Sequence, residues 1–315
     1  MSAERLAILS HSESFYSTRR LLEAARAVGL AASLIDPVRV TLSASGGPGP
    51  LFQDGAPLAA PELLVPRIGA RLTGWGLALV QGLVDAGSFS AAQAQAIGRA
   101  QDKLATTQRL AAAGLPVVPT VAVREPAHAD RALEALGGAP VVVKLREGSQ
   151  GRQVLLARND GEARRLIGSL TARGQAVLVQ PLVEAARGRD LRVLVIGGEP
   201  QAAVWRVAAA GEFRSNLHLG GRAEAAELNA EAGELARRAA RAMDLPLCGV
   251  DLLPSGDRLR VLEVNASPGL EGVEAATGRD LAREVVLWLR AALRAHRAGQ
   301  ASDHALWSRS SGGSA

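Results

Sequence analysis

Two stretches near the end of the chain predict a β-hairpin that brings two acidic side chains together. Residues 248–253 and 260–265 have the composition of strands, and the turn-forming residues 254–257 separate them. In such a hairpin Asp251 lies opposite or diagonal to Glu263, within reach across the strands. Two carboxylates at that spacing repel each other unless a cation lies between them.

The alternation of side chains along the second strand predicts which residues share a face. Glu263 and Asn265 should lie on one face, with Leu262 and Val264 on the other. Two carboxylates and an amide oxygen are hard ligands, which suit magnesium bound together with substrate phosphates. Zinc fits poorly, because the stretch offers no His or Cys ligand. A surface hairpin with solvated acids is the alternative.

The positive charge of the chain points to an anionic ligand. The net charge is +5 and the pI is about 10.4, yet of 36 basic residues only Lys103 and Lys144 are lysine. A chain that otherwise uses arginine can retain ammonium groups where a compact charge must meet phosphate, although chance retention is equally consistent. Aromatic residues make up 3% of the chain, too few for a base-stacking surface, so nucleic acid is not an expected partner.

Strand and helix patterns alternate along the chain, as in an α/β protein. The first strand–helix–strand run, at 6–35, predicts a parallel sheet with a ligand-facing edge, and Arg67 follows a later strand where it can project towards a ligand. Residues 63–69 are expected to form a strand that runs into a loop, and a small hairpin is expected at 52–57. The other expected strands are 6–10, 31–35, 120–123, 140–145, 153–157, 176–183, 190–198 and 201–207, and the expected helices are 15–28, 77–85, 91–113, 127–136, 162–172, 224–243 and 282–296.

Two loops carry residues that suit phosphate. The small residues 147–151 follow Lys144 and can form a lid whose backbone N–H groups close over phosphates, although a plain hairpin is the alternative. Neither the G-x-G-x-x-G fingerprint nor the Walker A pattern occurs. Arg206 and Arg214, near Asn216, suit a phosphate or a developing oxyanion, and a solvated basic loop is the competing interpretation.

The chain shows no sign of export or of membrane insertion. We find neither a run of about 18 uncharged apolar residues nor a secretory signal, so the cytoplasm is the expected location. A single cysteine excludes an internal disulfide, and Cys248 lies in an apolar strand. We expect a buried, inert thiol there.

Taken together, the motifs resemble the ATP-grasp superfamily and, within it, the RimK group of α-L-glutamate ligases, whose type member modifies ribosomal protein S6. The resemblance covers residues 5–292 and depends on the order of the motifs. They are residues 66–69 and 102–104, Lys144 before the Gly-rich stretch, Gln180, residues 213–218, Asp251 and residues 263–272.

The resemblance implies an α/β ATP-grasp fold in which two α+β lobes enclose an ATP site. Residues 1–92 would form an N-terminal pre-ATP-grasp domain, 93–180 the central lobe with the lid, and 181–296 the C-terminal lobe with the magnesium site. The Ser- and Gly-rich residues 297–315 would form a disordered tail.

The resemblance also implies roles for individual residues. ATP and two magnesium or manganese ions would be bound, and Arg206 or Arg214 would stabilise the oxyanion. The metal ligands would be Asp251, Glu263 and Asn265, the phosphate ligands Lys103, Lys144, Arg214, Ser215 and Asn216, the adenine neighbours Pro181 and Leu182, and the ribose neighbour Asp190.

The sequence departs from the family pattern at three places. Pro181 stands where the family usually has Glu, Arg152 and Gln153 replace a small apolar pair in the lid, and Leu219 replaces an arginine. The first bears on the adenine contacts and the others on the substrate pocket. The specificity for glutamate therefore stays open.

The resemblance implies a ligase that activates a carboxylate as an acyl phosphate and couples it to an amine. The partners would be ATP, an amino acid expected to be L-glutamate, and the C-terminus of a protein or peptide. A ligase for another amino acid or a small-molecule acceptor, a kinase, and a non-catalytic nucleotide-binding protein are the alternatives. No membrane partner is expected, and a homo-oligomer is left open.

Overall fold

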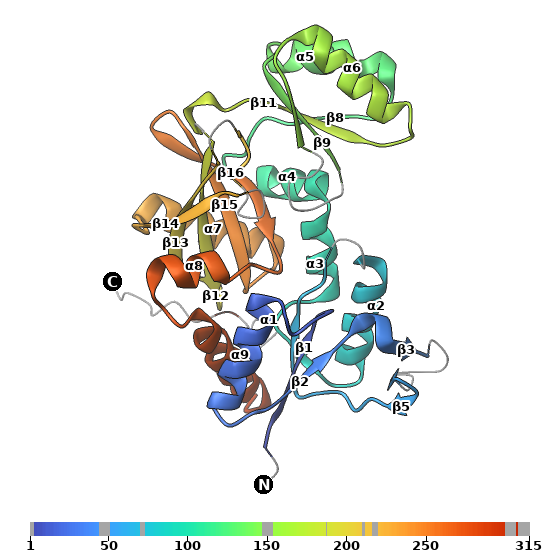
Figure 1. The fold of residues 1–315 in the computed structure, drawn as a ribbon, viewed down its shortest axis with the longest axis vertical. Helices are drawn as coiled ribbons and strands as arrows, with labels where there is room; N and C mark the ends of the chain where they lie inside the picture. The colour runs from blue at the N-terminus through green and yellow to red at the C-terminus, as the bar shows by residue number, and fades with distance from the viewer. Residues whose placement is uncertain are drawn as a thin grey trace.

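The structure is a computed structural model that describes residues 3–43, 51–69, 73–146, 154–186, 188–209, 212–215, 220–299 and 307. The predicted lid at 147–151, the departures Arg152, Gln153 and Leu219, and the candidate ligand Asn216 lie outside these residues. The structure has three parts, each built of helices and strands: an N-terminal domain, a central lobe and a C-terminal lobe (Figure 1).

A parallel sheet forms the N-terminal domain, as the strand–helix–strand start predicts. The apolar run Leu6–Leu9 is fully buried at its centre, because the sheet is covered on both faces. The strand order is β2-β1-β6-β7. The elements are β1 (Arg5–Leu9), α1 (Tyr16–Ala27), β2 (Ala31–Ile35), η1 (Pro37–Arg39), β6 (Leu63–Pro66), α2 (Thr73–Asp85) and β7 (Phe89–Ser90).

The small hairpin expected at 52–57 is present at the side of this domain. Asp54 and Gly55 both adopt positive φ angles, of 52° and 79°, which a tight two-residue turn requires. The hairpin belongs to a three-stranded sheet of β3 (Val40–Leu42), β4 (Leu51–Gln53) and β5 (Ala56–Pro57).

The single helix expected at 91–113 is wrong, because the chain breaks at Asp102. Asp102 has an extended backbone, and its side chain accepts hydrogen bonds from the backbone N–H groups of Leu104 and Ala105. It therefore caps a new helix. The two helices are α3 (Ala94–Gln101) and α4 (Lys103–Ala112), and Lys103 is the first residue of the second.

The central lobe is an antiparallel sheet with two helices on one face. Its strand order is β10-β9-β11-β8. A separate hydrophobic core, made entirely from residues between Val121 and Val179, fills the space between sheet and helices. The elements are β8 (Val121–Val123), η3 (Pro126–His128), α5 (Ala129–Leu136), β9 (Val141–Leu145), β10 (Val154–Ala157), α6 (Asp160–Thr171) and β11 (Val177–Pro181).

A five-stranded antiparallel sheet, in the order β14-β13-β12-β15-β16, forms the C-terminal lobe. The helix expected at 224–243 is wrong at its start: residues 222–226 pair with β13 as an edge strand, and the helix begins only after Asn229, which caps it. The elements are η4 (Glu184–Ala186), β12 (Arg189–Ile196), β13 (Glu199–Val207), β14 (Arg222–Ala226), α7 (Ala230–Met243), β15 (Cys248–Ser255) and β16 (Arg258–Asn265).

The last two helices return to the N-terminal domain. After α8 (Glu271–Thr277), helix α9 (Leu281–Arg297) packs beside α1. Figure 1 shows these first and last helices side by side. One core contains Leu6 and Leu22 together with Val285 and Leu289, so α9 covers the N-terminal sheet although it follows the C-terminal lobe. The proposed domain boundaries remain a prediction.

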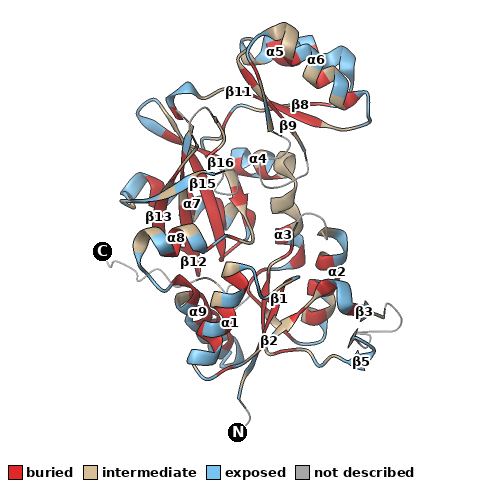
Figure 2. Cartoon of the chain, viewed as in Figure 1, coloured by how far each residue is buried: buried red, intermediate tan, exposed pale blue. Residues whose placement is uncertain are grey.

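The buried residues lie mainly in the sheets (Figure 2). Cys248 is fully buried in β15, and burial raises the pKa of its thiol, as expected for an inert cysteine.

Of the tail predicted at 297–315, the structure describes only 297–299 and Trp307, and Trp307 packs against the C-terminal lobe at Gly198. No helix in the described ranges is long and apolar enough to cross a membrane.

Candidate active site

The predicted hairpin is present, and its register brings the two acids face to face. Strands β15 and β16 are antiparallel, with Asp251 opposite Glu263 and Gly249 opposite Asn265. The amide of Asn265 donates to both carboxylates, with Nδ2 at 3.3 Å from Asp251 Oδ2 and at 3.3 Å from Glu263 Oε1. The expected cross-strand contact of the three side chains is therefore confirmed.

The predicted alternation fails at one residue of this strand. The register shifts between Asp251 and Leu252, which pairs with Val261, so Leu262 is an extra residue in β16. Val261 and Val264 are buried in the core, although Val264 also borders the cavity, whereas Leu262 is half-buried and lines the cavity beside Glu263. The expectation that Leu262 shares a face with Val264 is wrong, and the strand presents one apolar side chain to the cavity next to its polar ones.

Asp251 is fully buried beneath the cavity and is bound by two arginines. Arg192 donates to both of its carboxylate oxygens at 2.7 Å, and Arg206 Nη2 donates to Oδ2 at 2.7 Å. Burial raises the pKa of Asp251, but the charges of Arg192 and Arg206 outweigh it and lower the pKa to about 2. Asp251 is thus ionised at any physiological pH. Sequence reasoning missed Arg192, whose position opposite Asp251 in β12 only strand pairing reveals.

The three oxygen-bearing side chains fit magnesium after one rotation. The two arginines and Asn265 together use about four acceptor positions on Asp251, the capacity of a carboxylate. Turning the Asn265 amide by half a turn places its oxygen where its NH2 group lies and frees an acceptor on each acid. Burial and the neighbouring charge of Asp251 raise the pKa of Glu263, a repulsion that a cation would relieve.

The candidate metal site offers few ligands from the protein. Within the described residues, no group of three or more His, Cys, Asp and Glu side chains is placed to hold a metal ion. The candidate site therefore has two carboxylates and one amide, which leaves positions for phosphate oxygens and water.

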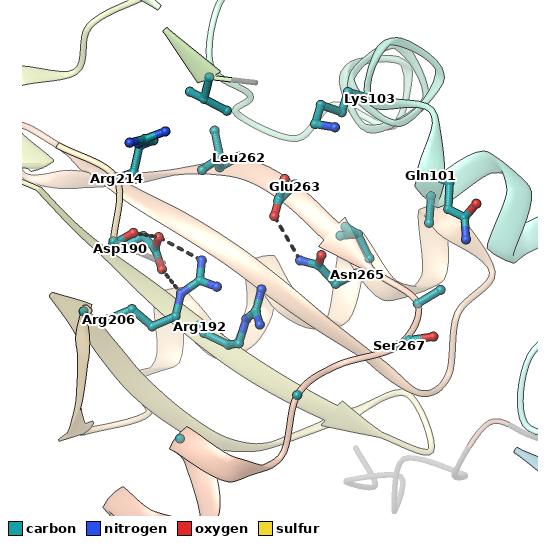
Figure 3. A pocket seen from close by; sticks show the side chains of 18 of the residues that line it. Gln101, Lys103, Asp190, Arg192, Arg206, Arg214, Leu262, Glu263, Asn265 and Ser267 are labelled. Atoms are coloured by element: carbon teal, nitrogen blue, oxygen red, sulfur yellow. Dashed lines mark hydrogen bonds and ion pairs between the residues drawn. The ribbon is translucent and has the colours of Figure 1, made fainter. Parts of the chain in front are cut away.

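The two lysines face the same space as Glu263. Lys144 lies in β9 and is buried, and burial lowers its pKa to about 8, with the charge of Glu263 opposing the shift and the charge of Lys103 adding to it. Lys103 points from the start of α4 towards the strand of Leu262 and Glu263 (Figure 3). Both lysines line one cavity with Glu263 and Asn265. Three separate parts of the chain thus contribute charges to one place.

A second buried ion pair lies beside the hairpin. Arg206 Nε and Nη2 donate to the two oxygens of Asp190 at 2.7 and 2.8 Å, and the hydroxyl of Ser215 donates to the same carboxylate. Figure 3 shows the Arg206 guanidinium against Asp190. Its Nη2 also donates to Asp251 Oδ2, so Arg206 connects the two acids. Arg214 lies nearer the surface and pairs with Glu212 at 2.6 Å.

The candidate adenine neighbours lie at the end of the cavity that is formed by the central lobe. Pro181 ends β11, and the backbone N–H of Leu182 donates to Pro140 O at 3.0 Å. Both line the cavity, as does Gln180, whose amide donates to Thr120 at 2.8 Å. Their proposed roles at the base, and that of Asp190 at the ribose, remain predictions.

The cavity is larger than one small ligand requires. Its volume is about 2560 Å³, whereas sites for a single small molecule are on the order of 300–1,000 Å³. It extends from the central lobe past the hairpin to the N-terminal domain, where Phe15 and Val38 lie exposed at its rim. The space suits a nucleotide together with further substrates.

Comparisons with known families match nearly the whole chain. Residues 5–97 match the family described as the RimK PreATP-grasp domain, and residues 100–289 match the RimK-like ATP-grasp domain. The two matches adjoin within α3, shortly before the helix that begins at Lys103.

Curated relatives cover the same length. A probable alpha-L-glutamate ligase of Thioalkalivibrio sulfidiphilus (strain HL-EbGR7) is 42% identical over 293 residues, 93% of this chain and 97% of the relative. Probable alpha-L-glutamate ligase 2 of Pseudoalteromonas atlantica (strain T6c / ATCC BAA-1087) is 41% identical over 282 residues, 90% of this chain and 94% of the relative.

Solved structures agree with the fold. The ATP-grasp ligase PsnB complexed with its minimal precursor has a TM-score of 0.73 at 23% identity and covers 92% of this chain and 99% of its own. The RimK domain protein ATP-grasp of Sphaerobacter thermophilus DSM 20745 has a TM-score of 0.71 at 24% identity, with 90% and 98% coverage. At these identities the likeness shows the shared fold alone.

Proposed function

The chain belongs to the RimK-like ATP-grasp family and is an ATP-dependent carbon–nitrogen ligase, and from this premise we propose that it adds L-glutamate to the C-terminal carboxylate of a protein or peptide. The observation that supports the proposal is the meeting of Glu263, Asn265 and both lysines in one cavity. The curated relatives named as probable alpha-L-glutamate ligases suggest the amino acid.

We propose that the described residues divide the work between nucleotide and metal. Asp251, Glu263 and Asn265 would hold two magnesium or manganese ions, which when bound neutralise charge on the ATP phosphates. Lys103 and Lys144 would bind the same phosphates, and Pro181 and Leu182 the adenine. Arg214 and Ser215 would lie near the phosphates, and Asn216, outside the described residues, would join them.

The proposed reaction proceeds in two steps. The acceptor carboxylate attacks the γ-phosphate, which gives an acyl phosphate and ADP. The amine of glutamate then attacks the acyl carbon, and inorganic phosphate leaves as the amide forms. Of the two candidate arginines for the tetrahedral oxyanion, Arg214 is the more accessible, because Arg206 is bound between Asp190 and Asp251.

A polypeptide acceptor is supported by the size and rim of the cavity. A volume of about 2560 Å³ leaves space beyond a nucleotide and an amino acid, and exposed Phe15 and Val38 offer apolar contacts at the N-terminal end. PsnB, which shares the fold, was solved with a precursor peptide. We place the reaction in the cytoplasm, where ATP is available.

A single assay tests the proposal. The protein is mixed with Mg²⁺, ATP, one amino acid at a time and peptides with free C-termini, and ADP and peptide mass are measured. We expect ADP release that depends on both substrates and a mass increase equal to whole glutamate residues. Extension with another amino acid, or ADP without any amide product, would refute the glutamate ligase assignment.

The pKa of Lys144 predicts how nucleotide affinity varies with pH. Only the ammonium form pairs with phosphate, and in the ligand-free protein that form is lost above about pH 8. The dissociation constant for MgATP should rise up to about tenfold per pH unit above that value. Calorimetric titrations between about pH 7 and pH 9.5 measure it. Lys144→Arg, which stays charged, should remove the dependence, and a flat wild-type profile would contradict the prediction.

A further inference from the structure

The carboxyl edge of the N-terminal sheet forms one wall of the cavity. Strands β1, β2 and β6 are parallel, so their last residues, Leu9, Ile35 and Pro66, meet at one edge. The residues that follow them, including Ser10, Pro37 and Arg67, line the cavity. Ligands of open parallel sheets bind in the crevice outside the carboxyl ends of the strands. This wall is therefore placed to contact substrate.

Arg67 is held at this edge without a carboxylate partner. Its backbone N–H donates to Leu9 O at 2.9 Å, and its Nη1 donates to Pro268 O at 3.0 Å. Across the described parts of the chain, no acid forms an ion pair with it, whereas Arg192 and Arg206 in the same cavity are each bound by carboxylates. Burial lowers the pKa of Arg67 to about 10. Holding a guanidinium there costs stability that an anionic ligand would restore.

The Arg67 guanidinium lines the same cavity as the candidate metal ligands Glu263 and Asn265 and is linked to their surroundings through Pro268. A Cβ atom at Gly249 would lie 3.3 Å from Pro268 Cβ and 3.4 Å from Arg192 Nε, so these residues form one packed layer. Arg192 binds Asp251, and Arg67 donates to Pro268 O, so this layer connects Arg67 to the candidate metal ligand Asp251. A group bound by Arg67 would thus lie beside the reacting atoms. This position suits a carboxylate that does not itself react.

We propose that Arg67 binds a non-reacting carboxylate of the substrate, through a fork of charge-assisted hydrogen bonds. The inference rests on the proposed function: an incoming amino dicarboxylate attacks through its amine and brings two carboxylates that need cationic partners. Lys103 and Lys144 are assigned to phosphate, and Arg192 and Arg206 are bound to Asp251 and Asp190. The same chemistry could be offered by the α-carboxylate or the side-chain carboxylate of the amino acid, or by an acidic side chain of the acceptor.

The test compares Arg67→Gln and Arg67→Lys with the wild type in the ligation assay. A hydrogen-bonded ion pair to a charged group predicts that Arg67→Gln raises KM for the carboxylate-bearing substrate about 10- to 100-fold. The KM for ATP and kcat should change by less than about twofold. Arg67→Lys, which keeps the charge but loses the planar fork, should give an intermediate rise.

Neutral analogues identify which carboxylate is bound. The wild type should discriminate against glutamine if the side-chain carboxylate binds Arg67, and against the α-amide of glutamate if the α-carboxylate does. Arg67→Gln should remove that discrimination and leave the other one unchanged. If instead only the acceptor KM moves, the carboxylate belongs to the acceptor. A second measurement needs no turnover: the amino acid should raise the melting temperature of the wild type and not of Arg67→Gln.

Arg39→Gln is the matched control, because Arg39 lies in the same domain but is exposed and pairs with Asp54. All its KM values should equal those of the wild type. If Arg67→Gln leaves every KM and the discrimination unchanged, or lowers only the melting temperature, Arg67 is a structural clamp on Pro268 and the inference is overturned. If the wild type uses another amino acid, the glutamate assignment fails, whereas the effect of Arg67→Gln on that substrate still tests this site.

Discussion

Replacing Glu263 with glutamine is expected to lower kcat at least about 10³-fold, which corresponds to ~4 kcal/mol of transition-state stabilisation. Glu263 lies opposite Asp251 and within the field of Lys144, and glutamine keeps its shape but removes the charge that would hold a divalent cation. ADP formation with saturating substrates and Mg²⁺ measures the loss. Normal turnover in this variant would show that the hairpin does not carry the metal site.

The same variant should not be less stable than the wild type. Burial and the charge of Asp251 raise the pKa of Glu263, so ionising it opposes folding above its unfolded pKa, and this cost is absent from glutamine. A melting temperature in the absence of ligands equal to or above that of the wild type at pH 8 is expected. Glu224→Gln, on an exposed edge strand where Glu224 pairs with Arg222, is the control and should change neither activity nor melting.

Replacing Arg206 with methionine is expected to lower the free energy of unfolding by ~3–5 kcal/mol, the range for removing one partner of a buried ion pair. Its guanidinium contacts Asp190 and Asp251, both essentially inaccessible to solvent, and each would lose a charged partner. Urea denaturation at pH 7 measures the change. Arginine pairing depresses the pKa of Asp251 to about 2, so the stability due to that pair is fully present at pH 7 and is lost as pH falls through that value.

Arg214→Met is the control for the effect of burial, because it removes the same charge from an ion pair that is nearer the surface. Arg214 and Glu212 are each 24% exposed, so their ion pair should contribute less than ~1 kcal/mol. If Arg206→Met costs no more than Arg214→Met, the buried network does not stabilise the C-terminal lobe as described. Because Arg214 is proposed at the oxyanion, its variant should instead lose activity while it unfolds like the wild type.

The sequence predicted the parts of the site that depend on local pattern. The turn-forming residues between two apolar stretches fixed the hairpin, and its pairing follows from strand geometry, so Asp251 and Glu263 meet as expected. The rarity of lysine singled out Lys103 and Lys144, and both line the cavity. In the N-terminal domain the strand–helix–strand pattern gave the parallel sheet correctly.

Three of the misses have long-range causes, and one has a local cause. The extra residue Leu262 arises from pairing with a neighbouring strand, which no alternation within β16 reveals. The edge strand at 222–226 has helix-forming alanine and glutamate, but pairing with β13 overrides that preference. Arg192 acquires its importance from Asp251, 59 positions later in the chain. Capping by Asp102 was a local signal, but it lay within an otherwise continuous helical pattern.

The self-contained core of the central lobe has a consequence for turnover. Since its apolar residues come from Val121 to Val179 alone, tilting this lobe as a rigid body uncovers none of that core (Figure 1). The chain crossings before β8 and after β11 must flex, and the ion pair of Arg146 with Asp102 and the hydrogen bond from Lys103 N–H to Arg146 O must break. Lys144 and Pro181 would travel with it, away from Glu263. If the central lobe moves slowly, we therefore expect the release of ADP, rather than the formation of the amide bond, to limit the rate of turnover.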